Sequence, residues 1–300
     1  MKAILLTQVF CQVDDYCKEF ESRFPKHLLA CSPDIIPAWK MPPCTLSMSE
    51  MITLVIAFHL SNYRTFKNFY NHVRQYCGAE FPSLVSYPRF IALQSYLLIP
   101  LCAYLSRRKG TITGISFVDS TSLVVCHNFR IHSNRTFKDL AKRGKTSTGW
   151  FFGFKLHLII NDRGELLAFK LTPGNTDDRA PVPEMTRGLW GKLFGDRGYI
   201  SKTLFDLLFK QDLQLITRIK KNMKNKLMPL EDKILLRKRA IIETVNDQLK
   251  NISQIEHTRH RSISGFILNL LGSLVAYTYQ DKKPSLHLET ATLQTLPAII

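Results

Sequence analysis

The sequence has no paired cysteine motif, few acidic side chains for its number of basic ones, and no apolar run long enough to cross a membrane comfortably. Its 7 cysteines are scattered, without a Cys-x-x-Cys pair or a histidine at zinc-finger spacing. This pattern argues against a disulfide framework and a structural zinc site, and favours reduced thiols in the cytoplasm. The longest apolar run, residues 265–279, is short for a bilayer and includes Asn269 and Ser273. We therefore expect a buried helix there and no membrane partner.

Acidic side chains are outnumbered by basic ones: 24 Asp and Glu stand against 41 Lys and Arg, which gives a formal net charge of +17. A basic field of this size makes nucleic acid the first partner to consider and an acidic membrane surface the second. The membrane surface is the weaker interpretation, because the basic residues are not gathered on one helix with an apolar face.

The chain changes its periodicity near Gly110, and no internal repeat is present. Residues 1–110 keep apolar side chains at three-to-four spacing, which predicts helices at the N-terminus, over 51–73 and over 87–105. Beyond Gly110 we expect a strand at 115–123, a basic loop at 128–149, a hairpin at 150–171, a helix at 180–189, a strand at 192–194, a helix at 202–210, a strand at 213–219, and helices at 231–252 and 263–279. This order predicts an α/β mixed sheet flanked by helices, preceded by an all-α N-terminal domain.

Asp119 is the residue around which we interpret the rest of the chain. It stands inside the apolar, β-prone stretch ISFVDSTSL, residues 115–123. A buried ionised carboxylate is costly unless a cation or hydrogen bonds compensate it. One interpretation is a strand end at which Asp119 faces water or caps the next turn. The other is a metal ligand held on a rigid sheet, which requires partner carboxylates further along the chain.

Two later carboxylates are candidates for these partners. Asp196 lies in GDRGY, directly after the expected strand at 192–194, and Glu243 lies at the edge of the apolar stripe of the expected helix at 231–252. Taken alone, Asp196 is an ordinary turn residue and Glu243 belongs to a solvated ladder of salt bridges. Taken together with Asp119, they match the chemistry of phosphodiester cleavage. Two divalent ions about 3.5–4 Å apart activate and stabilise the reacting oxygens, and Mg²⁺ prefers carboxylate ligands.

Three segments around these carboxylates resemble the DDE transposases of bacterial insertion sequences. RAIIETVNDQLK is similar to that family's signature Y-x2-R-x3-E-x6-K through Arg239, Glu243 and Lys250. Leu236 stands at the tyrosine position, which leaves the role of that tyrosine open. VDST, residues 118–121, resembles the strand of the first aspartate, and GDRGY, residues 195–199, resembles the turn of the second.

The resemblance covers about residues 110–280 and implies an RNase H-like catalytic domain. In such a domain Asp119, Asp196 and Glu243 are catalytic and bind Mg²⁺, with Mn²⁺ as the alternative ion. The implied reaction hydrolyses a DNA strand at the end of a mobile element and then lets the freed 3′-OH attack target DNA. The implied partners are double-stranded DNA, as terminal inverted repeats and as target, and a second copy of the chain in a homodimer on the bacterial nucleoid.

The same resemblance assigns supporting and DNA-binding residues. LTPGNTDD, residues 171–178, resembles the loop before the second aspartate, and it contributes two of the supporting residues (Asn175, Asp178, Arg239 and Lys250). Basic residues near Glu243 are expected to contact DNA phosphates without reading sequence (Arg218, Lys220, Lys221, Lys224, Lys226, Arg239 and Lys250). A run of like charges is more often a solvated loop, and that alternative stays open for residues 220–226.

The predicted organisation is a helical DNA-end-binding domain at 1–110, an RNase H-like DDE domain at 111–284 and a tail at 285–300. Two other functions remain open. One is an RNase H-like nuclease that cuts DNA without joining it. The other is an inactive relic of a transposase that only binds DNA, although the presence of all three carboxylates counts against it.

Overall fold

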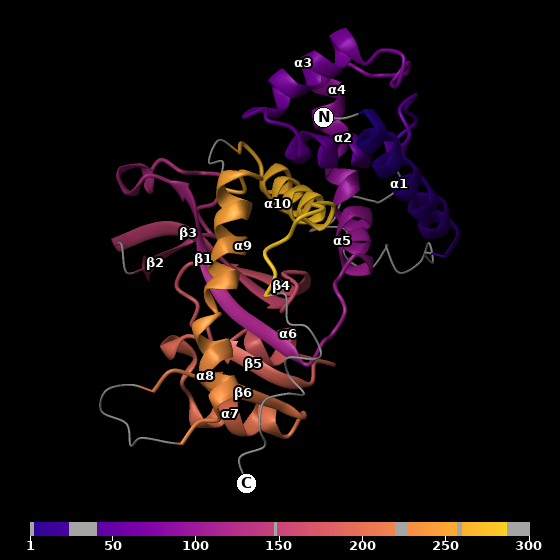
Figure 1. Ribbon diagram of the computed structural model, residues 1–300. Helices are drawn as coiled ribbons and strands as arrows, with labels where there is room; N and C mark the ends of the chain where they lie inside the picture. The colour runs from indigo at the N-terminus through magenta and orange to yellow at the C-terminus, as the bar shows by residue number, and fades with distance from the viewer. Residues whose placement is uncertain (1–2, 24–40, 147–148, 220–226, 257–259, 287–300) are drawn as a thin grey trace. The chain divides into compact units, whose positions relative to one another are not determined.

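The computed structural model describes residues 3–23, 41–146, 149–219, 227–256 and 260–286 (Figure 1). These residues form two compact units. Unit 1 is drawn from Met1–Arg108 and Leu249–Tyr279, and unit 2 from Lys109–Gln248 and Gln280–Ile300. The assignment of a DNA-end-binding role to residues 1–110 and a catalytic role to residues 111–284 stays a prediction. Of the expected tail, residues 287–300 lie outside the described residues, and Leu286 N donates to Asp162 O at 2.9 Å.

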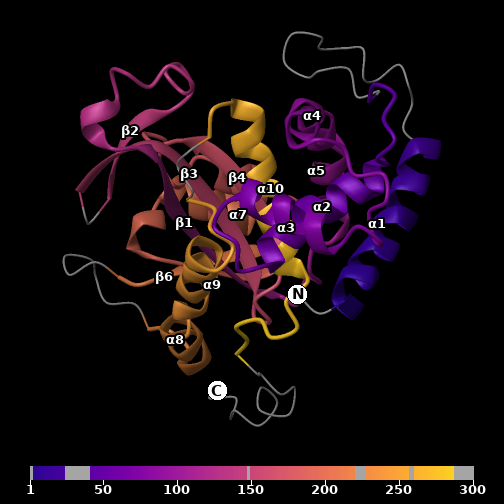
Figure 2. The same cartoon turned by 90° about the horizontal axis from the view of Figure 1, so that it is seen from above.

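Unit 1 is helical, as its periodicity predicts. Its elements are α1 (Ala3–Arg23), α2 (Met48–Leu60), α3 (Phe66–Tyr76), α4 (Tyr87–Leu93), the 3-10 turn η2 (Gln94–Leu97), α5 (Leu98–Arg107) and α10 (Ile263–Thr278). A capping box begins α2, because the Ser47 side chain accepts from Glu50 N while the Glu50 carboxylate accepts from Ser47 N. The almost entirely buried α2 packs against both α1 and α10 (Figure 2).

Two helix predictions in unit 1 need correction. The expected helix at 51–73 is two helices, because the chain becomes extended at Ser61 and a new helix starts behind the cap residue Thr65. The expected helix at 87–105 is divided by η2, just before Pro100, which has no N–H for the helical ladder. The run Tyr87–Arg107 is the one stretch in the described ranges that meets the length and composition of a membrane span. Phe90, Leu97 and Leu101 in it are fully buried.

Unit 2 contains a mixed sheet with the strand order β2-β3-β1-β5-β6, to which β4 adds by pairing with β3. The strands are β1 (Ile115–Cys126), β2 (Lys142–Thr146), β3 (Gly149–Asn161), β4 (Leu166–Pro173), β5 (Gly191–Gly195) and β6 (Leu213–Thr217). β1 runs antiparallel to β3 and parallel to β5, and β5 runs parallel to β6. This confirms the predicted fold class, an α/β mixed sheet of the RNase H-like kind with flanking helices and a helical N-terminal part.

The helical elements of unit 2 are η3 (Asn128–Arg130), α6 (Val182–Met185), η4 (Arg197–Tyr199), α7 (Lys202–Phe209), α8 (Leu230–Arg237) and α9 (Ala240–Asn251). Side chains from β1, β5 and α7 share one buried core that includes Val118, Leu193 and Leu208. The last residues of α9 belong to unit 1.

Three predictions in unit 2 also need correction. The expected helix at 231–252 is broken between α8 and α9, where Ile241 N and Ile242 N bond to carbonyls only three residues back. The expected helix at 180–189 is the single turn α6, because the prolines at 181 and 183 donate no hydrogen bonds. The basic stretch at 128–149 is not all loop: β2 forms by backbone pairing with β3, with Gly144 opposite Phe151.

A buried ion pair joins α8 to the sheet and gives a test of the packing in unit 2. Lys192 Nζ on β5 donates to Asp232 Oδ1 on α8 at 2.6 Å, and the Asp232 side chain is only 4% exposed. We expect Lys192→Met to lower the free energy of unfolding by about 2–4 kcal/mol, because it leaves a buried carboxylate without its cation. Urea unfolding at pH 7 measures this change.

Lys170→Met is the matched control. Lys170 on β4 pairs with Glu184 on α6, and both side chains are about a third or more exposed. Its loss should cost about 0–1 kcal/mol. Equal losses in the two variants would show that burial of Asp232 does not determine the strength of the contact.

Candidate active site

The register between β1 and β5 sets Asp119 and Asp196 at the same level of the sheet. The two parallel strands pair at Ile115↔Lys192, Ser116↔Leu193 and Phe117↔Phe194. Each aspartate follows two residues after the last pair, and side chains two apart on a strand share a face. The rings of Phe117 and Phe194 stack with centroids 5.5 Å apart, which fixes that common face. The two aspartates therefore lie side by side where the turn η4 takes the chain out of β5.

The third carboxylate comes from α9. Glu243 lies in the first turn of this helix, and Arg239 precedes it at the break from α8. Arg239 Nη2 donates to Glu243 Oε1 at 2.5 Å, and its Nη1 lies 3.8 Å from Asp119 Oδ1. Asn246 Nδ2 donates to Asp119 Oδ2 at 3.1 Å. One guanidinium and one amide thus connect α9 to the carboxylate on β1.

A cavity of about 370 Å³ opens over this place. It is lined by residues of the turn after β5, of the end of β6 and of the junction between α8 and α9, among them Asp196, Arg218, Leu236, Arg239 and Glu243. The Glu243 side chain is 56% exposed, whereas the Asp119 side chain is only 21% exposed. The cavity therefore gives access from solvent to an acidic site with arginines on its wall.

The environment of Asp119 disfavours its charged form. The pKa of Asp119 is raised to about 6, chiefly by burial. The negative charges of Asp196 and Glu243 also raise this pKa, whereas Arg239 and the backbone N–H of Ser120 lower it. Tyr199, buried in η4, has a pKa well above its ordinary value because of burial and because of the charges of Asp119, Asp178 and Asp196. The carboxylates of the site are thus close enough to influence one another.

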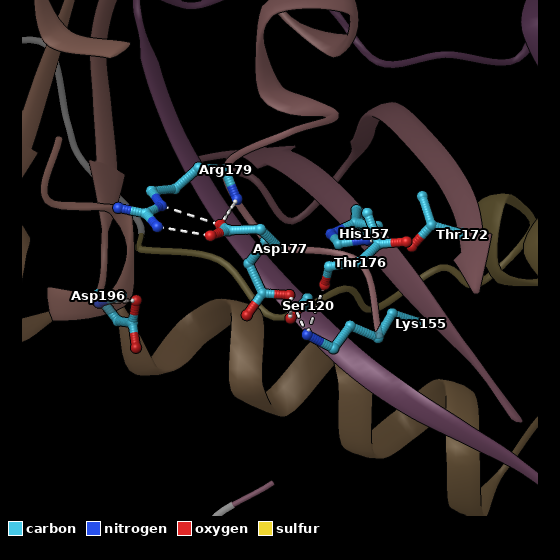
Figure 3. Close-up of polar contacts among 10 residues, drawn as sticks. Ser120, Lys155, His157, Thr172, Thr176, Asp177, Arg179 and Asp196 are labelled. Atoms are coloured by element: carbon cyan, nitrogen blue, oxygen red, sulfur yellow. Dashed lines mark hydrogen bonds and ion pairs between the residues drawn. The ribbon is translucent and has the colours of Figure 1, made fainter. Parts of the chain in front are cut away.

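The loop before β5 supports the strand that carries Asp119. Asp178 Oδ1 accepts from Ser120 Oγ at 2.8 Å and from Lys155 Nζ at 2.9 Å, and Lys155 also donates to Thr176 O at 2.9 Å (Figure 3). Asn175 is exposed and lines a second cavity, of about 470 Å³, that Asp178 also borders. Asp178 therefore lies one hydrogen bond from the residue next to Asp119.

Neighbouring charged groups of this loop lie close to the Asp196 turn. The Arg179 guanidinium donates two hydrogen bonds to the Asp177 carboxylate (Figure 3). Arg179 Nη1 also donates to Ile200 O at 3.4 Å. The hydrogen bonds from Arg179 hold the pKa of Asp177 at about 2. His157 is buried on β3 against Thr172, and burial lowers its pKa to about 4, so it is neutral at pH 7.

The remaining predicted residues are only partly brought to the site. Arg218 is exposed and lines the cavity of Asp196 and Glu243, and Leu236 is buried on its wall. Lys250 forms an ion pair with Glu256 at 3.3 Å in unit 1. Four predicted DNA-binding lysines (Lys220, Lys221, Lys224 and Lys226) lie outside the described residues.

The donor set suits a hard divalent cation, because it consists of carboxylate oxygens on two strands and a helix. In the described part of the chain, however, no three His, Cys, Asp or Glu side chains are gathered closely enough to hold a metal ion as they stand. Arg239 lies between Asp119 and Glu243 and supplies positive charge there. The chemistry of the site therefore fits Mg²⁺ or Mn²⁺, and binding would require Arg239 to leave at least one of its two carboxylates.

Comparison with protein families matches residues 109–263 to the transposase DDE domain, which is more than half of the 300 residues. The chain belongs to the DDE transposase family. This confirms the resemblance seen in the sequence and makes DNA the partner of the protein. The matched range of the transposase includes Asp119, Asp196 and Glu243. A search of curated proteins gives no match to the chain.

Sequence reasoning missed three residues of the site: Ser120, Tyr199 and Asn246. Asn246 had a usable signal, because it follows Glu243 by three residues and so shares its side of a helix. Tyr199 closes the GDRGY segment, but only the turn of η4 directs it beneath the aspartates. The contacts of Ser120 and Lys155 depend on the pairing of β1 with β3, where Ser122 lies opposite Lys155.

The raised pKa of Asp119 predicts a stability effect with a definite sign. Its folded-state pKa of about 6 exceeds the ordinary 3.8, so the folded state retains a proton that the unfolded chain releases. Asp119 therefore lowers the free energy of unfolding as pH rises from about 4 to about 6. Without divalent ions, Asp119→Asn should raise that free energy by about 1–3 kcal/mol at pH 7 and by much less at pH 4.

Urea unfolding at the two pH values measures this effect. Asp206→Asn, at an exposed position on α7, is the control and should change stability by less than about 0.5 kcal/mol at either pH. Destabilisation by Asp119→Asn at both pH values would mean that the carboxylate is already fully compensated by Arg239 and Asn246.

Proposed function

We propose that this transposase cuts DNA strands at the ends of an insertion sequence and joins the freed 3′-OH to target DNA. The observation that carries the proposal is the parallel register of β1 and β5, which aligns Asp119 with Asp196, while Asp196 and Glu243 line one cavity. Family membership supports the same reaction class. We place the activity in the bacterial cytoplasm, on the nucleoid.

In this proposal Asp119, Asp196 and Glu243 are the catalytic residues and hold Mg²⁺, or Mn²⁺ in its place. When bound, the ions would stabilise charge on the phosphate oxygens and make an oxygen nucleophile available near neutral pH. Asn246 and the backbone of Ser120 keep the Asp119 carboxylate oriented, since both donate hydrogen bonds to it. When Arg239 no longer contacts one of its two carboxylates, its guanidinium can make a two-point contact with a DNA phosphate.

The surrounding residues would support and extend the site. Asp178 keeps β1 and the loop 174–178 together through Ser120 and Lys155, and Asn175 on the same loop faces the adjoining cavity. Arg218 and the lysines of residues 220–226, together with Lys250, would contact phosphates. Residues 1–110 would recognise the terminal inverted repeats, and two copies of the chain would act as a homodimer that brings the two ends together.

Replacement of each proposed ligand by alanine tests the catalytic assignment. Asp119→Ala, Asp196→Ala and Glu243→Ala should each reduce Mg²⁺-dependent cleavage at least about a hundredfold, because even outer partners of metal ligands are worth about 10–100-fold. DNA affinity should change little, since it depends mainly on phosphate contacts elsewhere. Nicking of an end-containing duplex and joining of a pre-cut 3′-OH end to a plasmid are the two measurements.

Asp206→Ala, in exposed α7, should leave both reactions unchanged. An alanine variant with near-normal cleavage would remove that residue from the site. Cleavage without joining in the wild-type chain would instead support a nuclease of the same fold.

Neutralising the basic segment tests whether it contacts the DNA backbone. Each lost phosphate contact should reduce the magnitude of the log K against log[salt] slope by about 0.9 for duplex DNA. Replacing Lys220, Lys221, Lys224 and Lys226 by Gln, with or without Arg218→Gln, should weaken specific and non-specific duplexes about equally and make the slope shallower. A loss confined to the terminal-repeat sequence would show that the segment reads bases, and an unchanged slope would show that it does not touch the backbone.

A further inference from the structure

We propose that the surface formed by η3, β2 and the first residues of β3 binds an unpaired DNA strand by stacking bases on Phe129 and Trp150. The inference concerns binding alone. It rests on DNA being the partner of the family and does not depend on cleavage or strand transfer.

Two large aromatic side chains are exposed at this edge of the sheet. Phe129 is 91% exposed and Trp150 is 62% exposed. Asn128 Nδ2 donates to Trp150 O at 2.8 Å, which ties η3 to the start of β3. The His127 ring stacks on Phe129 with centroids 5.0 Å apart. Both rings therefore present exposed aromatic surface to a ligand, with His127 against one face of Phe129.

Positive charge surrounds the rings. Residues 127–155 contain seven Lys and Arg against one Asp. Lys145 lies opposite Trp150 in the pairing of β2 with β3, and its Nζ is 5.7 Å from the centroid of the Trp150 ring. Arg143 lies two residues before Lys145 on β2 and is also exposed. Exposed aromatic faces interleaved with cations are typical of proteins that bind single strands, because bases stack on the rings while phosphates meet the cations.

The surface leads toward the candidate active site. The cavity of about 470 Å³ is lined by Arg143, Lys145 and Trp150 from the hairpin and by Arg179 and Gly198 from the opposite side. Gly198 N donates to Asp196 Oδ1 at 2.8 Å. A strand stacked on Trp150 would therefore have a polar, cation-lined path to the neighbourhood of Asp196.

An unpaired strand fits this surface better than a duplex. In duplex DNA the faces of the bases are covered by their stacked neighbours, so an exposed ring has no base face to contact. In a single strand every base offers a face, and such stacking is tolerant of sequence. The chemical class of the ligand is therefore a DNA strand with unstacked bases, such as a frayed or single-stranded end.

The test compares the affinities of the full chain for a labelled mixed-sequence 12-nucleotide single strand and for its duplex, by fluorescence anisotropy in EDTA. Trp150→Ala should weaken single-strand binding about fivefold or more, and Phe129→Ala should act in the same direction. Duplex affinity should stay within about twofold for both. Trp150→Phe, which keeps a stacking ring, should recover most of the loss.

Phe209→Ala is the matched control, because Phe209 in α7 is also 62% exposed but stacks on Phe205 with centroids 5.9 Å apart. It should bind both ligands as the wild type does. Wild-type single-strand affinity in Trp150→Ala would overturn the proposal. Equal losses on single strand and duplex would also overturn it, because they would point to charge or folding and not to stacking.

A second measurement needs no change at the site. In a Trp39→Phe, Trp190→Phe chain the fluorescence comes from Trp150 alone, since the protein has 3 tryptophans. Saturating single strand should quench this fluorescence through contact of a base with the indole. Unchanged fluorescence at saturation would show that no base stacks on Trp150.

Discussion

β5 pairs with β1 only as far as Phe117, because β5 ends at Gly195 and the chain turns out of the sheet at Asp196. On its other side β1 continues beside β3 for several more residues. This difference in length leaves one side of β1 open just where Asp119 occurs. The open side is where α9 reaches the sheet, through the hydrogen bond from Asn246 to Asp119. We call the place where β5 leaves β1 the fork in the sheet. The fork sets the positions of Asp119 and Asp196, and α9 brings Glu243 to it.

The fork also determines the electrostatics of the site. A carboxylate on a strand covered by a helix loses water, and burial is the largest reason for the raised pKa of Asp119. Arg239 offsets part of this cost by lying between Asp119 and Glu243. Lys155 and Asp178 form a second, direct ion pair, and Ser120 on β1 donates a hydrogen bond to the same Asp178 oxygen. The chain as a whole carries a net charge of +17, which is the sign that attracts DNA.

Local patterns in the sequence predicted much of this arrangement. The apolar stretch at 115–123 indicated a strand, and a carboxylate inside that apolar strand indicated a special site. The break between α8 and α9 could not be predicted from the sequence, because the apolar stripe continues across Lys238 and Arg239. β2 was missed because Lys142, Arg143 and Lys145 carry no apolar alternation, and the strand exists through its backbone pairing with β3. The role of Asn246 depends on the tertiary contact between α9 and β1.

We propose that Asp119, Asp196 and Glu243 share a cation site at the fork between β1 and β5. Anomalous diffraction from crystals soaked in Mn²⁺ locates such an ion without reference to activity. We expect a manganese peak within about 2–2.5 Å of oxygens from Asp119 and Asp196, with the Arg239 guanidinium moved away from Asp119. Mn²⁺ bound only elsewhere, with Arg239 still between Asp119 and Glu243, would contradict it.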